Sequence, residues 1–375
     1  MSSEIAVVGA GVVGAATALE LARRGASVAL LEAEPEPALQ ASGTNSGILH
    51  TGFDSIPGEL ETELVLRAAE RRDLVLEALG VPVLRCGALM QPLGEGDQEA
   101  IERLAQNARR NGVDASLRRD GVLEVPGEAV TDPVRYTLAL AAAAERHGTE
   151  LRTGFEVVRL CRERGRFVLE SARGETVRCG IVVNCAGLHA DDVARLAGDR
   201  SFEIYPRKGE FLVFDPPAGT PLERILLPVP TERTKGVLVF PTLDGKVVAG
   251  PTAVDQKDKS DWSVRAEAAK EILTKAAAMW PPIEHARQVG AYAGLRPAGR
   301  DSNYVIGRSD VCEGLVNVAA IRSTGLTASL GIAERVCALV SSLGVRLGEQ
   351  RQLEPGPVAE PKGPWWLRTA EHVAA

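Results

Sequence analysis

The sequence lacks the features that mark several classes of protein. Aromatic residues make up only 4% of its 375 residues, and the formal net charge is -7. Few aromatic rings are therefore available to stack on bases, and an acidic chain repels nucleic-acid phosphates. No apolar stretch reaches the roughly 20 residues that a helix needs to cross a bilayer. We expect a globular protein with no nucleic-acid partner.

The cysteines and the first residues exclude further classes. The six cysteines are scattered, with no C-x-x-C pair, which fits neither a zinc site nor an iron–sulfur cluster. We expect no metal, and free thiols in a reducing cytoplasm. The chain opens with a short strand and a glycine turn, MSSEIAVVGAG, rather than with a signal peptide. The pair Trp365-Trp366, followed by Arg368, adds the alternative of a peripheral contact at the inner face of a membrane.

The first motif is a glycine pattern between a strand and a helix. Gly9, Gly11 and Gly14 follow the apolar strand EIAVVG in the pattern G-x-G-x-x-G, and a second strand ends at Glu32. In a β-α-β unit these glycines allow a tight turn, the approach of a pyrophosphate and close helix–strand packing. The helix N-terminus stabilises phosphate charge, and Glu32 can accept hydrogen bonds from ribose hydroxyls. The motif predicts a bound dinucleotide.

The next segment distinguishes FAD from NAD. After the second strand the chain enters a long loop without regular periodicity, EAEPEPALQASGTNSGILHTG, in which the stretch from Ala41 to Asp54 carries three glycines and His50. A long glycine-rich loop beside a nucleotide-binding fold is usually functional. Its glycines let the backbone lie flat against a planar ring system. This arrangement favours FAD.

Seven motifs in order resemble one flavoprotein family. They are VVGAGVVG with Glu32, SGTNSGILHTGFD followed by PGELE, VVNCAG, IYPRKGEF, VLVFPTLDGKVVAGPTAVD, GLRPAGRDSNYVIG and IRSTGLTASLGIAERV. Between Glu4 and Leu343 the chain thus resembles the glycine/D-amino-acid oxidase-type superfamily. Within it, the sequence is most similar to the branch of glycerol-3-phosphate dehydrogenases and oxidases and L-2-hydroxyglutarate oxidases. Many respiratory members continue into a cysteine-bearing C-terminal domain; such cysteines are not found here, so we expect neither an iron–sulfur relay nor a fixed respiratory partner.

The resemblance implies the fold class and a division into domains. We expect an α/β protein with a discontinuous Rossmann-like FAD-binding domain and an α+β substrate domain with an antiparallel sheet. The FAD-binding domain is expected in residues 1–85, 140–200 and 290–345, the substrate domain in 86–139 and 201–289, and an irregular tail in 346–375. Periodicity and end signals predict helices over residues 13–24, 59–80, 97–111, 131–148, 264–280 and 326–344.

Several residues are expected to bind FAD. They are Gly9, Gly11, Gly14, Glu32, Ser42, Thr44, Asn45, Ser46, Val157, Ala186, Gly187, Gly325, Leu326 and Thr327. The resemblance places His50 beside the flavin, where a neutral imidazole suits the removal of a hydroxyl proton. The alternatives for His50 are a buried structural role and a covalent bond to the flavin. Surface or structural roles are expected for the remaining histidines, His147, His189, His285 and His372.

Three cations are candidates for binding an anionic substrate. Arg296 lies in a segment that lines the substrate cavity in relatives, and a guanidinium binds carboxylate or phosphate with two donors. Lys235 precedes a strand and can reach a phosphate, and Arg322 falls on the C-terminal loop. The alternatives are a surface salt bridge for Arg296 and an ordinary turn for Lys235. The glutamates at positions 59, 61 and 63 are expected on a solvated helix face.

The residues and the resemblance together predict an FAD-dependent enzyme that oxidises a small anionic CH–OH substrate. The first choice is sn-glycerol 3-phosphate, with His50 as base and Arg296 as the second catalytic candidate. The alternatives are an L-2-hydroxy acid such as L-2-hydroxyglutarate, an amine or amino acid, and a flavoprotein subunit without turnover. Oxygen, a quinone or a carrier protein is the expected electron acceptor.

Overall fold

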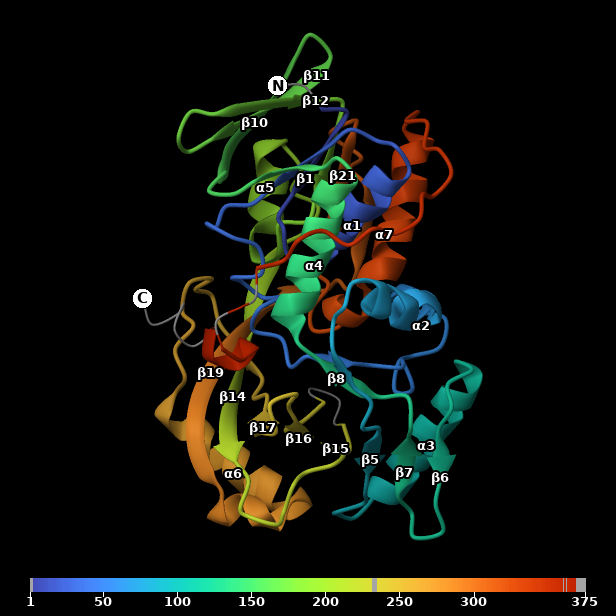
Figure 1. Ribbon diagram of the computed structural model, residues 1–375, viewed down its shortest axis with the longest axis vertical. Helices are drawn as coiled ribbons and strands as arrows, with labels where there is room; N and C mark the ends of the chain where they lie inside the picture. The colour runs from blue at the N-terminus through green and yellow to red at the C-terminus, as the bar shows by residue number, and fades with distance from the viewer. Residues whose placement is uncertain (1–2, 231–234, 360, 362, 369–375) are drawn as a thin grey trace.

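The computed structural model describes residues 3–230, 235–359, 361 and 363–368. Figure 1 shows two parts stacked along the long axis, one around β1 and β21 and the other around β14 and β19. The first part has a mostly parallel sheet, and antiparallel pairs predominate in the second. The expected α/β fold class with an antiparallel substrate part is confirmed. His372 lies outside the described residues.

The parallel sheet forms the centre of the first part. Its strands in spatial order are β20 (Val305–Arg308), β21 (Leu315–Ala319), β13 (Ile181–Asn184), β1 (Ile5–Val8), β2 (Val28–Leu31) and β9 (Glu150–Arg152). All pairs are parallel except β20 with β21. The central strands are continuous apolar runs because both faces of a parallel sheet are covered.

Helices cover one face of this sheet, and a small sheet covers the other. The first face packs against α1 (Val12–Arg23), α4 (Pro133–Arg146) and α7 (Gly325–Ser342). The second face packs against β10 (Val157–Glu163), β11 (Arg166–Ser171), β12 (Thr176–Cys179) and α5 (Ala190–Leu196), which follows the short helix η1 (Gly187–His189). Asp132 caps α4 by accepting from the amides of Val134 and Arg135, which is the typical arrangement at a helix N-terminus.

The second part is built on a larger twisted sheet. Its strands in spatial order are β18 (Val254–Asp255), β14 (Ile204–Asp215), β17 (Val247–Gly250), β16 (Leu238–Pro241), β15 (Ile225–Leu227), β5 (Ala88–Met90), β7 (Leu123–Val125) and β6 (Ser116–Leu117). The long strand β19 (Arg287–Gly299) also pairs with β14. The helix α6 (Ala266–Met279), followed by η2 (Pro281–His285), packs on one region of this sheet, and α3 (Asp97–Arg110) packs on another.

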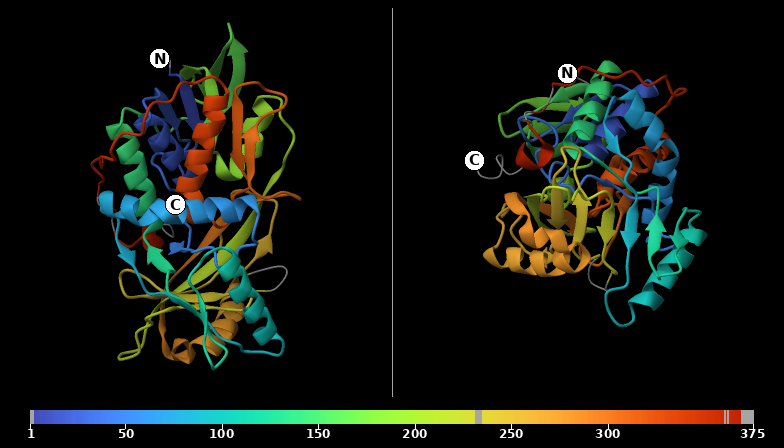
Figure 2. Two further views of the ribbon diagram at one scale, coloured as in Figure 1. Left: turned by 90° about the vertical axis from the view of Figure 1, so that its right-hand side faces the viewer. Right: turned by 60° about the horizontal axis from the view of Figure 1, so that its bottom comes forward.

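A short sheet and one long helix lie between the two parts. The strands are β3 (Ile48–Leu49), β8 (Ala129–Thr131) and β4 (Val83–Leu84), and the helix is α2 (Leu60–Ala78). Figure 2 shows α2, in light blue, crossing between the parts beside α7. The two helices pack so closely that a Cβ at Gly331 of α7 would lie only 2.2 Å from the carbonyl oxygen of Leu64 in α2. This junction positions the loop that carries His50.

The structure differs from two expectations about the C-terminal half. Residues 290–299 were assigned to the FAD-binding domain, yet they belong to β19 and pair with β14 in the second sheet. The indole rings of Trp365 and Trp366 were candidates for a membrane surface, but they are only 2% and 6% exposed and pack in the core of the second part. These two side chains are therefore not exposed for the membrane contact that the sequence suggested. Among the described residues, no helix is both long and apolar enough to cross a bilayer.

Candidate active site

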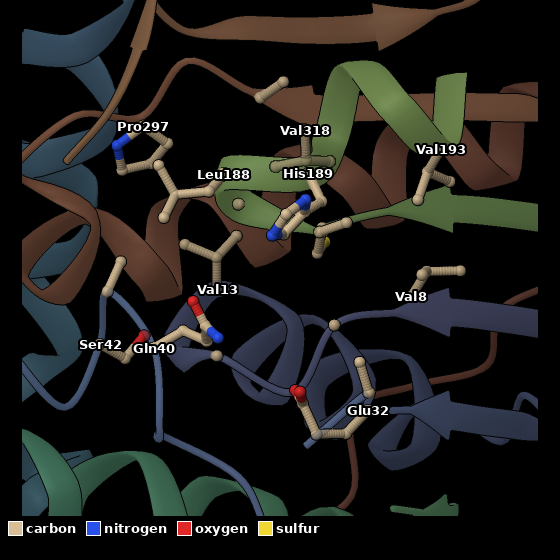
Figure 3. A pocket seen from close by; sticks show the side chains of 18 of the residues that line it. Val8, Val13, Glu32, Gln40, Ser42, Leu188, His189, Val193, Pro297 and Val318 are labelled. Carbon is tan, nitrogen blue, oxygen red and sulfur yellow. The ribbon is translucent and has the colours of Figure 1, made fainter. Parts of the chain in front are cut away.

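A cavity of about 730 Å³ opens at the carboxyl ends of the parallel strands. Figure 3 shows Glu32, Val13, Ser42 and His189 around it. Glu32 directly follows β2, Val13 belongs to α1, Ser42 lies in the loop after β2, and His189 belongs to η1. The loop after β21 and the N-terminus of α7 complete the wall. Ligands of open α/β sheets bind in this crevice.

The glycine turn shapes the floor of this cavity. Gly9 has a φ of +99°, and a Cβ there would lie 2.5 Å from the carbonyl oxygen of Cys185. A Cβ at Gly14 would lie 1.9 Å from the carbonyl oxygen of Gly9, so α1 packs directly on the turn. The N-terminus of α1 therefore lies at the cavity wall, where the amide of Val12 donates to Oγ of Ser42 at 2.9 Å. A pyrophosphate fits this cradle, where helix amides stabilise negative charge.

Glu32 marks the other end of the cradle. It is buried, and its carboxylate accepts hydrogen bonds from the amides of Ala10 at 2.7 Å and Glu34 at 3.0 Å. Burial raises the pKa of Glu32, although these hydrogen bonds oppose the shift. The carboxylate is thus fixed in the wall of the cavity, where it can accept a hydrogen bond from a ribose hydroxyl.

The residues expected to bind FAD divide into three groups. Those in the wall of the first cavity are Gly9, Gly11, Glu32, Ser42, Asn45, Val157, Ala186, Gly187, Gly325 and Leu326. Thr44 and Ser46 line a second cavity instead. Gly14 packs behind the turn, and Thr327 accepts a hydrogen bond from the amide of His50 at 3.1 Å. These positions fit a dinucleotide, with Gly14 and Thr327 acting through packing and loop support.

The second cavity, of about 410 Å³, adjoins the first. The two share Ala41, Asn45 and Arg322 in their walls. The second wall also contains His50, Lys235 and Arg296, so the cavity brings together the cations and the base that the sequence singled out. A ligand in this cavity would lie next to the end of a dinucleotide bound in the first.

His50 is held by hydrogen bonds from several directions. Its Nδ1 lies 2.9 Å from Oε2 of Glu128, and its carbonyl oxygen accepts from Nη1 of Arg72 at 2.7 Å. The His50 side chain is 16% exposed, whereas that of Glu128 is fully buried. With Nδ1 occupied by Glu128, Nε2 is the nitrogen left for a ligand.

Lys235 forms an ion pair at the rim of the second cavity. Its Nζ lies 2.6 Å from Oδ2 of Asp54, and the side chain is 47% exposed. The partial loss of water around Lys235 would alone lower its pKa, but Asp54 raises it by more. Burial alone would raise the pKa of Asp54, but Lys235 and then His50 lower it by more. Lys235 is therefore a cation at neutral pH, and an ammonium with three donors can hold Asp54 and a further anion together.

Arg296 is anchored by backbone carbonyls rather than by a carboxylate. Its Nε donates to the carbonyl of Arg207, and its Nη2 donates to the carbonyls of Lys208 and Thr252, at 2.8–3.0 Å. Burial lowers the pKa of Arg296 to about 10, helped by the charge of Arg207 on the facing strand. The surface salt bridge that we considered for Arg296 is therefore wrong. Its guanidinium is a fixed cation in the cavity wall.

A polar network orders the loop between the two cavities. Asn303 accepts from Nε of Arg322 at 2.9 Å and donates to Glu61 at 2.8 Å. Glu61 also accepts from the hydroxyl of Thr324, at 2.8 Å, just before α7. Glu61 was expected on a solvated helix face, but it lines the second cavity and supports this loop. Arg322 has a φ of +50°, a backbone conformation unusual for a residue other than glycine.

Three residues of the two cavities or their support were missed or misassigned from the sequence. Glu128 lies 78 residues from His50 in an unremarkable turn, and no spacing rule connects them. Asp54 ends the same glycine-rich stretch as His50, which is a signal that could have been used. His189 was expected to be superficial or structural; it is exposed and pairs with Asp192, yet it also lines the first cavity. Within the described ranges, no group of three or more His, Cys, Asp or Glu residues could hold a metal ion.

Comparison with known proteins agrees with this architecture. Among curated proteins, glycerol 3-phosphate dehydrogenase of Caloramator mitchellensis is 28% identical over 96% of this chain and 78% of its own. Glycerol 3-phosphate oxidase of Mycoplasma pneumoniae is 28% identical over 90% of this chain and 94% of its own. L-2-hydroxyglutarate dehydrogenase of Nematostella vectensis is 28% identical over 67% of this chain and 62% of its own.

Solved structures and a family model support the same assignment. Dithionite-reduced L-α-glycerophosphate oxidase of Mycoplasma pneumoniae with FAD bound superposes with a TM-score of 0.87 at 26% identity, covering 94% of this chain and 98% of its own. The model of the family described as FAD dependent oxidoreductase matches residues 4–339. The expected cofactor, FAD, is thereby confirmed. The chain belongs to the DAO family of FAD-dependent oxidoreductases.

Proposed function

We propose that this enzyme oxidises the CH–OH group of a small anionic substrate, with sn-glycerol 3-phosphate, giving dihydroxyacetone phosphate, as the first choice. The observation that carries the proposal is the second cavity, which places His50, Lys235 and Arg296 around one space beside the cofactor cavity. The names of the relatives agree with a CH–OH substrate that carries a phosphate or carboxylate. These anions differ in charge and shape, so the substrate itself has to be identified by experiment.

Each polar residue has a separate task in this proposal. Arg296 and Lys235 bind the anionic group, which orients the carbinol toward the cofactor. Nε2 of His50 accepts the hydroxyl proton while the carbinol carbon loses a hydride. FAD, when bound, supplies the acceptor for that hydride. The proton on His50 gives an imidazolium, whose charge is stabilised by the carboxylates of Glu128 and Asp54.

The N-terminus of α7 contributes to the charge balance at the junction of the cavities. Gly325 and Leu326 begin this helix and line the cofactor cavity. A helix N-terminus stabilises negative charge in its vicinity. We infer that this helix N-terminus would stabilise negative charge on a bound FAD; oxygen, a quinone or a carrier protein is the proposed electron acceptor.

The first test is anaerobic mixing of the FAD-loaded enzyme with single compounds. Glycerol 3-phosphate, L-2-hydroxyglutarate and several amino acids are added separately, and the flavin absorbance is followed. We expect rapid bleaching by glycerol 3-phosphate, and readmission of air then shows whether oxygen restores the colour. Bleaching by L-2-hydroxyglutarate alone would identify the second substrate class. Bleaching by amino acids alone, or by none of the compounds, would refute the proposal.

The second test is His50→Ala in the same assay. Loss of a positioned general base costs about 10²–10⁴-fold in rate, so we expect flavin reduction to slow by that factor while FAD content stays unchanged. His285→Ala is the matched control, because this histidine is exposed and lines neither of the two cavities. Reduction of the His50 variant at the normal rate by the true substrate would remove His50 from the mechanism.

A further inference from the structure

The carboxylate of Glu128 meets His50 because of strand register. β3 and β8 pair antiparallel, with Ile48 opposite Val130 and Leu49 opposite Ala129. Continuing this register by one residue places His50 opposite Glu128. Facing side chains of an antiparallel pair have Cβ atoms about 5 Å apart, so the two side chains are directed to one another by the backbone itself.

The contacts of the Glu128 carboxylate determine which nitrogen of His50 carries the proton. Its Oε1 accepts from the amide of Thr51 at 2.7 Å and from the hydroxyl of Thr51 at 2.9 Å. Its Oε2 lies 2.9 Å from Nδ1 of His50. An ionised carboxylate only accepts hydrogen bonds, so this contact requires the imidazole proton to be on Nδ1. Nε2 then carries the lone pair.

The charges around His50 include a buried cation close to the carboxylate of Glu128. The Arg72 guanidinium is buried near Glu128, and burial lowers the pKa of Arg72 while the charge of Glu128 raises it. Arg72 also donates to the carbonyl of His50. The other facing charges are Asp54 and, through its ion pair, Lys235. A buried carboxylate is stable when it has a cation nearby and its oxygens accept hydrogen bonds.

We propose that Glu128 is a positioning residue that keeps the proton of His50 on Nδ1, so that Nε2 is the atom that takes the substrate proton. The proposal rests on His50 being the base. When the substrate O–H bond breaks, the proton forms a bond to Nε2 of His50. The carbinol carbon gives up its hydride, for which FAD, when bound, is the acceptor. Glu128 takes no proton in this step; its negative charge stabilises the imidazolium, which later releases the Nε2 proton to solvent.

The direct test is the tautomer of His50, which can be read without any substrate. We would label the FAD-loaded enzyme with ¹⁵N-histidine and record imidazole nitrogen spectra at neutral and mildly alkaline pH, using His50→Ala to assign the signals. We expect the neutral His50 ring to carry its proton on Nδ1. A proton on Nε2 in the unmodified enzyme would overturn the proposal, and no variant has to fold for that result.

The variant Glu128→Gln separates positioning from mere support. The amide and the hydroxyl of Thr51 both donate to one oxygen of residue 128, so a glutamine there would direct its carbonyl oxygen to Thr51. Its NH₂ group would then face Nδ1 of His50 and donate to it. We expect the His50 proton to move to Nε2 and the flavin reduction rate to fall about 100-fold or more, with substrate affinity changing little. Glu124→Gln is the matched control, since Glu124 lies in β7 and pairs with Arg224 on the surface.

Each outcome of this comparison has a defined meaning. An Nδ1 tautomer and a normal reduction rate in Glu128→Gln would reduce Glu128 to a structural residue and overturn the proposal. If no tested compound reduces the flavin, the proposed function fails, while the tautomer measurement still decides the role of Glu128. If Glu128→Gln loses its FAD or unfolds, Glu128→Asp, which keeps the charge, is expected to retain the Nδ1 tautomer; an Nε2 proton there would also contradict the proposal.

Discussion

At the scale of single residues, the hydrogen bonds of Arg296 hold a buried cation in a position where it can bind an anion. Three backbone carbonyls occupy its Nε and Nη2, so the guanidinium cannot rotate, and among the described residues no bond is made by Nη1. Burial, with Arg207 directly opposite in the strand register, lowers the pKa of Arg296 to about 10. An anionic substrate would compensate the positive charge of this buried guanidinium, which favours binding.

The prediction at Arg296 concerns affinity. In Arg296→Lys the charge remains, but one ammonium cannot hold the three carbonyls and also present a second donor to the substrate. We expect the substrate Kd in anaerobic titration to rise about 10–100-fold, the range for losing a charged hydrogen bond, with a smaller change in the maximal reduction rate. Arg300→Lys, at an exposed residue paired with Glu203, is the control. An unchanged Kd would assign Arg296 to structural support.

The candidate site could be predicted from sequence only where its residues carry a local signal. His50 lies in a stretch whose glycines interrupt every period, and Arg296 and Lys235 are cations inside recognisable motifs. Glu128 carries no such signal, because its role arises from the pairing of two very short strands, β3 and β8. Register between strands far apart in the chain depends on tertiary packing, which single-sequence periodicity does not encode.

At the scale of elements, helices were predicted more accurately than strands. The helix expected over residues 264–280 spans Ala266–Met279, and the one expected over 326–344 spans Gly325–Ser342. Their C-terminal ends agree with local signals, because Pro281 follows the first helix and Gly344 follows the second. The strand β19 could not be assigned in this way, because its membership in the second sheet depends on β14, about 80 residues earlier. The expected boundary at residue 290 falls inside β19, whereas the other expected domain boundaries remain predictions.

The C-terminal strap, residues 348–356 and 364–368, joins the two parts of the molecule. Figures 1 and 2 show this red segment passing over α1 and α4 toward β19. Its first half bonds to the ends of these helices: the amides of Gly348 and Arg351 donate to the carbonyls of Arg24 and Arg23 at the end of α1, and Nη2 of Arg351 donates to the carbonyl of His147 after α4. Its second half inserts Trp365 edge-on against Tyr292 of β19. Tyr292 stacks on Phe211, which lines the second cavity.

This chain of rings predicts an effect of the strap on both stability and binding. Trp365→Ala removes a buried ring, which costs about 3–5 kcal/mol of the free energy of unfolding. We also expect weaker substrate binding, because Tyr292 and Phe211 lose their support at the cavity wall. Leu367→Ala, in the same helical turn but partly exposed, is the control. Thermal unfolding and anaerobic titration check the two effects; an unchanged melting temperature would show that the strap is not part of the core.

At the scale of the whole molecule, the cofactor cavity is where the parts meet. Most of its wall comes from the first part, but Pro297 belongs to β19 of the second sheet, and Asn45 and Arg322 also face the substrate cavity. The motifs predicted this cavity because its wall is made largely of consecutive residues after strands. They did not predict how the second part closes it, which depends on the pairing of β14 with β19 and on the strap.

A ligand held by both parts stabilises both. FAD that binds only the folded enzyme adds about 2.7 kcal/mol at 100 times its Kd. For a chain of 375 residues, this corresponds to a rise in melting temperature of about 3 °C. Circular dichroism reports mainly on the helices, whereas Trp280, Trp365 and Trp366, three of the four tryptophans, lie in cores of the second part. Fluorescence therefore reports largely on that part.

We expect FAD added to the apoprotein to raise the melting temperature measured by both probes, by about 2 °C for each tenfold increase in concentration well above the Kd. ADP, which has only the nucleotide end of FAD, is the comparison ligand, and it should leave the fluorescence transition unchanged if the parts unfold separately. A fluorescence transition that FAD leaves unchanged, while the circular dichroism transition rises, would show that the cofactor stabilises the first part alone. Coupling between the parts would then depend on the contacts of α2 and the C-terminal strap.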